Sequence, residues 1–112
     1  MRSVTFSIGT LDDMKRRVDA ALRGRKRGSH LSFCSPELFL RTLTAKRWEI
    51  VRAMTGAGPI SIREVARRVD RDVKAVHGDV TALLNAGVLH KENGRVVFPF
   101  DEIRLDVRMK AA

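Results

Sequence analysis

Residues 61–98 read SIREVARRVDRDVKAVHGDVTALLNAGVLHKENGRVVF, and this stretch decides which fold the sequence predicts. Ser61 followed by Glu64 is the pattern of a capping box, in which each side chain satisfies a free backbone amide at a helix start. Apolar residues at 62, 65, 66 and 69 then recur at helical spacing, which predicts a short helix with one buried face. The polar turn at 70–72 ends this helix and supplies the N-cap of the next one.

A second, longer helix is expected over 73–85, where the inward positions are Val73, Val76, Val80, Leu83 and Leu84. Gly87 suits the end of this helix, because glycine adopts a left-handed conformation at little cost. Asn93 and Gly94 lie between two β-prone runs and predict a tight hairpin, since both residues tolerate a positive φ. Helix, turn, longer helix and hairpin in this order predict a winged helix-turn-helix. For the whole chain we therefore expect a mainly α fold with a β-hairpin wing.

Three segments are expected along the chain. They are an N-terminal strand and helix extension at 1–43, the winged helix-turn-helix domain at 44–100 and a C-terminal tail at 101–112. Polar and apolar residues alternate at 3–8, which predicts a strand, and again at 103–109, where a strand or a short helix fits. We expect these two alternating ends to pair, either within one chain or between subunits.

The N-terminal extension also carries a narrow apolar seam at helical spacing, formed by Leu11, Met14, Val18 and Leu22. A helix of about a dozen residues is marginal on its own, so this one must dock on another surface. Two surfaces fit equally well: the rest of its own chain, or the same seam of a second copy in a homodimer.

The charge of the chain favours a nucleic-acid partner. In 112 residues, 22 Lys and Arg oppose 13 Asp and Glu, giving a net charge of +9. Such a balance is typical of nucleic-acid binders but does not distinguish DNA from RNA, and it also occurs in basic proteins from arginine-rich proteomes. No run of about 18 apolar residues is present, so no membrane partner is expected. A single cysteine, Cys34, fits a reducing, cytoplasmic setting.

The second helix of the pair is expected to contact the DNA bases, because such a helix enters the major groove with its N-terminal end. The residues expected to reach base edges are Arg71, Lys74, Ala75, His77, Gly78 and Thr81. The residues expected to contact phosphates are Arg63, Arg67, Arg68, Lys91 and Arg95. A glycine in mid-helix costs up to about 1 kcal/mol, which close approach to DNA or to a neighbouring helix would explain. For any single residue of this face, a solvated helix surface is the alternative.

No catalytic, metal or cofactor site is expected from the sequence. The three histidines have no partner at helical spacing, and no Cys-x-x-Cys pair occurs, so neither a metal nor another cofactor is predicted. No glycine-rich phosphate loop follows a strand, and no catalytic constellation is recognisable, so an enzyme is not expected. Cys34 is expected to be a small buried residue in preference to an oxidant-sensing thiol.

Over residues 43–98 the chain resembles winged-helix transcriptional regulators of the MarR and ArsR type, on the phrases LTAKRWEIVRAM, GPISIREVARRVDRDVKAVHGDVTALLNAGVL and ENGRV. The order FCSPE, LTAKR, RDV and VFPFDEI is similar to that of small MarR-like predicted DNA-binding proteins, which include antitoxins. The resemblance implies a homodimeric repressor of duplex DNA, often of its own operon. It also implies an alternative, an antitoxin that neutralises a toxin protein by direct binding. An RNA-binding role is a third reading, which rests on charge alone.

Overall fold

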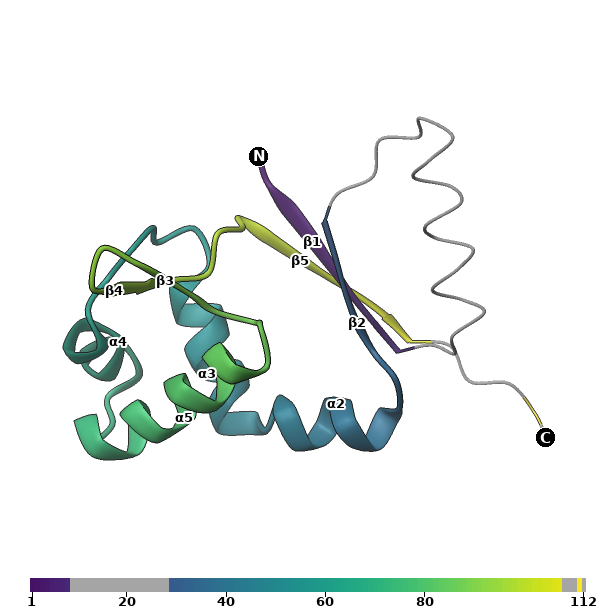
Figure 1. Cartoon of the computed structure of the whole chain (residues 1–112), viewed down its shortest axis with the longest axis horizontal. Helices are drawn as coiled ribbons and strands as arrows, with labels where there is room; N and C mark the ends of the chain where they lie inside the picture. Colours follow the sequence, from purple (N-terminus) through teal and green to yellow (C-terminus); the bar gives the residue numbers. More distant parts are fainter. Residues whose placement is uncertain (9–28, 108–110, 112) are drawn as a thin grey trace.

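A computed structural model describes residues 1–8, 29–107 and 111 of the chain (Figure 1). In chain order its elements are β1 (Ser3–Ile8), β2 (Ser29–Phe33), α2 (Pro36–Thr42), α3 (Ala45–Met54), α4 (Ile62–Val69), α5 (Val73–Asn85), β3 (His90–Glu92), β4 (Arg95–Val97) and β5 (Glu102–Val107). In Figure 1 α4, α5 and the hairpin β3–β4 lie on the left, and the sheet of β1, β2 and β5 lies to their right, in the centre of the view.

Strands from distant parts of the chain build the sheet. Its order is β2-β1-β5, and both neighbours of β1 run parallel to it. Phe6 in the central strand is in register with Leu31 of β2 and Leu105 of β5. The backbone of Arg2 and that of Asp101 hold the starts of β1 and β5 together, through a bond of 2.8 Å from the Asp101 amide to the Arg2 carbonyl oxygen. The sheet therefore joins the two ends of the chain.

One aromatic side chain of the central strand contacts both the sheet and the helical part. Phe6 is fully buried and meets Phe33, Trp48 and Phe98 edge-on, with ring centroids 6.2 to 6.3 Å apart. Edge-to-face contacts of this kind are favourable because the positive edge of one ring meets the negative face of the other. The sheet and the helical part therefore share one core.

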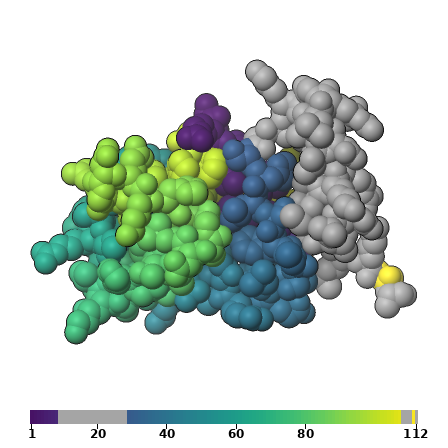
Figure 2. Space-filling model, in the orientation of Figure 1, coloured from purple at the N-terminus to yellow at the C-terminus, as the bar shows by residue number. Residues whose placement is uncertain are grey.

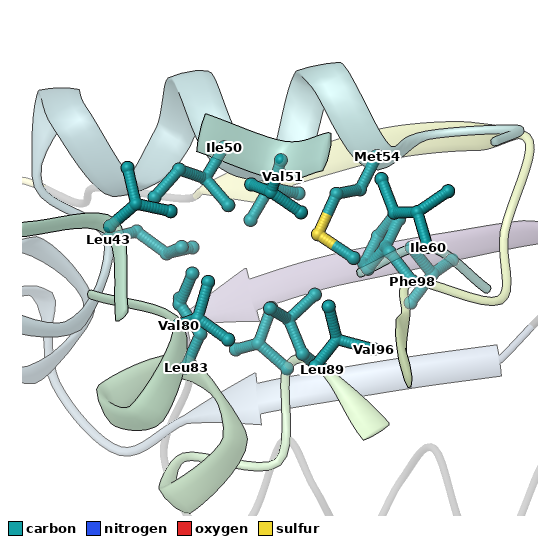
Figure 3. Close-up of a cluster of buried hydrophobic side chains, with 14 of the residues drawn as sticks. Leu43, Ile50, Val51, Met54, Ile60, Val80, Leu83, Leu89, Val96 and Phe98 are labelled. Atoms are coloured by element: carbon teal, nitrogen blue, oxygen red, sulfur yellow. The ribbon is translucent and has the colours of Figure 1, made fainter. Parts of the chain in front are cut away.

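In the helical part of that core, α4 and α5 pack against α3. The buried side chains of this part, most of them drawn in Figure 3, include Leu43, Ile50, Val51, Met54, Ile60, Val65, Val76, Val80, Leu83, Leu89 and Val96. Backbone bonds between Ile60 and Val96 attach the hairpin to the segment that precedes α4, at 2.9 Å in each direction. The hairpin is thus tied to the same core that holds α4 and α5 in place.

The expected fold class is wrong. A mainly α winged helix-turn-helix was predicted, whereas the described part of the chain contains four helices and five strands, three of them in a parallel sheet. The fold is therefore α/β. The physical reason is that pairing between β1 and β5 joins residues about a hundred positions apart, which periodicity within a short window does not reveal. The predicted N-terminal strand exists, but it is the centre of a sheet.

The local elements expected within 61–98 are confirmed. The Ser61 hydroxyl accepts a bond from the Glu64 amide at 3.1 Å, as a helix cap does. Gly87 closes α5 with a φ of 78°, and Asn93 and Gly94 turn the hairpin with φ of 51° and 77°. Positive φ at both central residues is the signature of a type I′ turn, which matches the twist of the two strands.

Three further expectations have different outcomes. The seam at 11–22 lies outside the described residues. Cys34 is exposed, so its expected burial is wrong; it lies just before Ser35, whose side chain caps the start of α2. Within the described residues no helix combines the length and the apolar character needed to cross a membrane.

Candidate nucleic-acid interface

Helix α5 has one fully buried stripe and, opposite to it, one exposed stripe. Val76, Val80 and Leu83 each have 0% exposure and fix the rotation of the helix about its axis. The Asp72 carboxylate caps the helix by accepting from the amides of Lys74 and Ala75, at 3.0 and 3.4 Å. Because side chains follow one another every 100° around a helix, the face opposite the valines is determined by these contacts.

The predicted base-reading residues, with one exception, lie on the exposed side of α5. Those exposed are Lys74, Ala75, His77, Gly78 and Thr81. Positions 74, 78 and 81 are spaced by four and three residues, so they form a single line along the helix. The Thr81 hydroxyl donates to the His77 carbonyl oxygen at 2.8 Å, and the side chain remains exposed. In Figure 2 α4, α5 and the hairpin occupy the left part of the visible surface, in teal to light green.

Arg71 is the exception. Its side chain is 17% exposed, and its Nη2 lies 2.8 Å from Oδ2 of Asp79. The other carboxylate oxygen of Asp79 accepts from Nε of Arg47 on α3, at 3.0 Å. Arg47 also donates through Nη1 to the carbonyl oxygens of Arg41 and Thr42, at 3.3 Å each. The bond from Arg71 thus joins the turn to α5, and the bond from Arg47 joins α3 to α5, so Arg71 is not a free side chain on the exposed side of α5.

The Asp79 carboxylate stays ionised despite its low exposure. Burial alone would raise the pKa of Asp79, but the hydrogen bonds from Arg71 and Arg47 outweigh burial and hold this pKa below its ordinary value. One carboxylate thus balances two guanidinium groups, one on α3 and one in the turn before α5. This arrangement ties the first half of α5 to α3 and to the turn that precedes it.

The predicted phosphate-binding residues fall into two groups. Arg67 and Arg68 of α4 are bound to Glu64, with their closest nitrogens 2.6 and 2.7 Å from Oε2. The hydrogen bonds from Arg67 and then Arg68 lower the pKa of Glu64 to about 2. Glu64 therefore does not complete the reciprocal capping box, because its carboxylate is engaged by these two arginines.

Arg63, Lys91 and Arg95 form the second group. All three are exposed, and within the described residues none of them takes part in an ion pair. Lys91 and Arg95 lie on opposite strands of the hairpin, on either side of the Asn93–Gly94 turn. A hollow of about 430 Å³ beside the hairpin is lined in part by Arg95 and Pro59. These cations are available to an anionic partner without breaking an existing bond.

Two residues of this region escaped the sequence reasoning. Val73 was expected to face inward, but its side chain is 43% exposed, because the first residue of a helix has no preceding turn to cover it. Asp79 was not singled out. A carboxylate at the border of a buried stripe needs cationic partners, and this requirement is the sequence signal that points to it.

The described residues contain no group of three His, Cys, Asp or Glu side chains able to hold a metal ion. The predicted dimer seam, Leu11, Met14, Val18 and Leu22, lies outside the described part, so the structure places none of its side chains.

The sequence model of the HVO_A0114 family matches residues 42–105, which is more than half of the chain. The chain belongs to this family. No curated protein and no solved structure matches it.

Proposed function

We propose that this member of the HVO_A0114 family binds double-stranded DNA through the exposed line of α5 and acts in the cytoplasm as a sequence-specific transcriptional repressor. The observation that carries the proposal is the position of Lys74, Gly78 and Thr81, aligned on one exposed face of α5. Lys91 and Arg95 of the hairpin are exposed as well, and they take part in no ion pair among the described residues. A helix is narrow enough to enter the major groove, where side chains distinguish all four base pairs.

The residue chemistry of this line fits base edges. Lys74, in the first turn of α5, can donate to guanine O6 and N7, and His77 supplies a further polar group one turn later. The methyl groups of Ala75 and Thr81 suit the C5-methyl group of thymine. Val73, exposed at the same end of the helix, adds a third apolar contact of this kind. Cations at the hairpin and at Arg63 would contact the backbone, which fixes orientation without reading sequence.

The direct test is a fluorescence-anisotropy titration of the full chain. One duplex carries the region upstream of the protein's own gene, and a second duplex has the same length and composition in shuffled order. Specific complexes typically form about 10³ times or more tightly than nonspecific ones at physiological salt. Equal affinity for the two duplexes at several salt concentrations would contradict reading of that region, and no binding to either would contradict the proposal as a whole.

Gly78→Ala separates the stability of α5 from its function. A Cβ built on Gly78 meets no heavy atom of the described residues within 4 Å, so packing within the chain does not require the glycine. We expect the variant to gain up to about 1 kcal/mol in free energy of unfolding, as alanine does over glycine within a helix. Its affinity for the preferred duplex should nevertheless fall, because the added methyl group keeps the backbone away from the groove. Urea unfolding and anisotropy on the same sample measure both effects, and an unchanged affinity would remove the close-approach explanation.

Neutralising the hairpin should flatten the salt dependence of binding for every duplex. Each phosphate contact contributes about 0.9 to the slope of log K against log salt, so Lys91→Gln with Arg95→Gln should reduce the slope by about 1.8. The matched control is Arg2→Gln with Arg41→Gln, two exposed cations next to the sheet and on α2. Anisotropy at four salt concentrations gives both slopes. If the control pair lowers the slope as much as the hairpin pair, the phosphate contacts lie elsewhere.

A further inference from the structure

Strand β5 lies at one edge of the parallel sheet. It pairs with β1 on one side, and no strand within residues 1–8, 29–107 and 111 pairs with its other side. Leu105 and Val107 point to the same face as the buried Phe6, because they share its register and parity, yet they remain 50% and 51% exposed. An edge strand with exposed apolar side chains is a template for pairing with another strand, and proteins usually cover such an edge.

The sequence of β5 is complementary to itself in the antiparallel direction. A twofold axis perpendicular to the sheet relates two copies of the edge strand. The two strands then run antiparallel, and their apolar faces lie on the same side. Centred on Leu105, this pairing sets Ile103 opposite Val107. On the other face it sets Arg104 opposite Asp106, and the symmetry makes this charge pair twice.

Neighbouring registers lose this complementarity. A pairing centred on Arg104 places Arg104 opposite itself and Glu102 opposite Asp106, and a pairing centred on Asp106 places two carboxylates face to face. Like charges directly opposite each other are destabilising. A slip by a single position instead puts apolar residues against charged ones on both faces. Of the two registers that pair five residues of β5 with the apolar faces on the same side, only the one centred on Leu105 places no like charges opposite each other.

We propose that the occupant of the β5 edge is β5 of a second copy of this chain, joined in the register centred on Leu105. The two sheets then form one sheet with the order β2-β1-β5-β5-β1-β2. Across the junction Leu105 meets Leu105 of the second copy and Val107 meets Ile103, so these side chains lose exposure to water. In Figure 1 α4, α5 and the hairpin lie to the left of the sheet that carries the β5 edge.

This inference does not rest on DNA binding, because it is tested on the protein without DNA. Sedimentation equilibrium over a range of concentrations should show a dimer for the full-length protein. Arg104→Asp puts two carboxylates opposite each other at both charge pairs, and Asp106→Arg puts two guanidinium groups there. Each variant alone should therefore dimerise about tenfold more weakly, or worse, since about 1.4 kcal/mol corresponds to a factor of ten.

Mixing the two variants is the decisive measurement. In a heterodimer, the two carboxylates of the first variant, at positions 104 and 106, would face the two guanidinium groups of the second. The mixture should therefore recover near wild-type affinity, and so should the double variant Arg104→Asp, Asp106→Arg. Control changes of the same charge at exposed positions of α3, Lys46→Asp and Glu49→Arg, should leave the dimer unchanged. Circular dichroism confirms that each variant is folded.

Leu105→Lys gives an independent arm of the test, because it sets two ammonium groups against each other at the twofold axis. This variant should be a folded monomer at concentrations where the wild type is a dimer. The proposal is overturned by a monomeric wild type, by single variants that dimerise as well as the wild type, or by a mixture that does not recover affinity.

Discussion

Replacing Lys74, His77 and Thr81 together by alanine should remove the proposed preference of the protein for an operator upstream of its own gene, while leaving its affinity for unrelated duplexes nearly unchanged. All three side chains are exposed, and the bond that Thr81 makes is to the backbone of its own helix. Each good base contact is worth about 1–3 kcal/mol of discrimination, so losing several should lower the preference by about a hundredfold or more. Nonspecific affinity persists because the cations of the hairpin and of α4 are unchanged.

A matched control carries three alanines on the exposed side of another helix, at Lys46, Glu49 and Arg52 of α3. That variant should keep the preference of the wild type. Competition anisotropy, with labelled operator and unlabelled operator or shuffled duplex as competitor, measures the ratio directly. If the variant of α5 still discriminates as the wild type does, this helix does not read bases, and the proposed function loses the observation on which it stands.

The parts of the fold that the sequence predicts well are those specified by neighbouring residues. The Ser61 cap, the Gly87 terminus and the Asn93–Gly94 turn each depend on the conformational preference of one or two side chains. Such preferences act over a few residues and survive whatever the rest of the chain does. The bounds of α4 and α5 follow from the same local signals.

The sheet is a different case, because its pairing is not local. Alternation at 3–8 and 103–109 indicated two possible strands and the expectation that they pair, and the structure confirms that they pair within one chain. Parallel pairing with a third strand, β2, was not predicted. That strand is short, and its first two residues, Ser29 and His30, are exposed, so its sequence has only a weak apolar pattern. The winged helix-turn-helix signal therefore dominated the prediction, and the fold class was wrong.

At the candidate site, the sequence predicts which side of α5 faces outward but not which cations are already engaged. Arg71 lies in the turn before α5 and looks free in the sequence, yet a carboxylate eight positions later binds it. The pairs of Glu64 with Arg67 and Arg68 are three and four positions apart, a spacing at which helical side chains meet. That second pairing was therefore readable from the sequence, whereas the first required the packing of α5 on α3.

Asp79→Ala should be among the most destabilising single substitutions outside the apolar core. The carboxylate accepts from Arg71 at 2.8 Å and from Arg47 at 3.0 Å, and the side chains concerned are 17 to 25% exposed. A hydrogen bond to a charged group contributes about 1.5–3 kcal/mol, so losing both should cost about 3 kcal/mol of unfolding free energy. Most of the loss arises because two guanidinium groups remain poorly hydrated and without their counter-charge. Urea unfolding at neutral pH measures this difference.

Asp79→Asn distinguishes the charge from the shape, since the amide keeps the size of the side chain and one acceptor oxygen. The pKa of Asp79 in the folded protein lies below its ordinary value of 3.8, so the unfolded chain takes up the proton first as pH falls. The stabilisation by the carboxylate is therefore complete above about pH 5 and is lost as pH falls through 3.8 towards the folded pKa. The difference in unfolding free energy between wild type and Asp79→Asn should accordingly shrink between pH 6 and about pH 3. Glu64 titrates in the same acidic range, but it is present in both proteins and cancels in the difference. A difference that stays constant over this range would show that the shape of Asp79, and not its charge, holds α5 against α3.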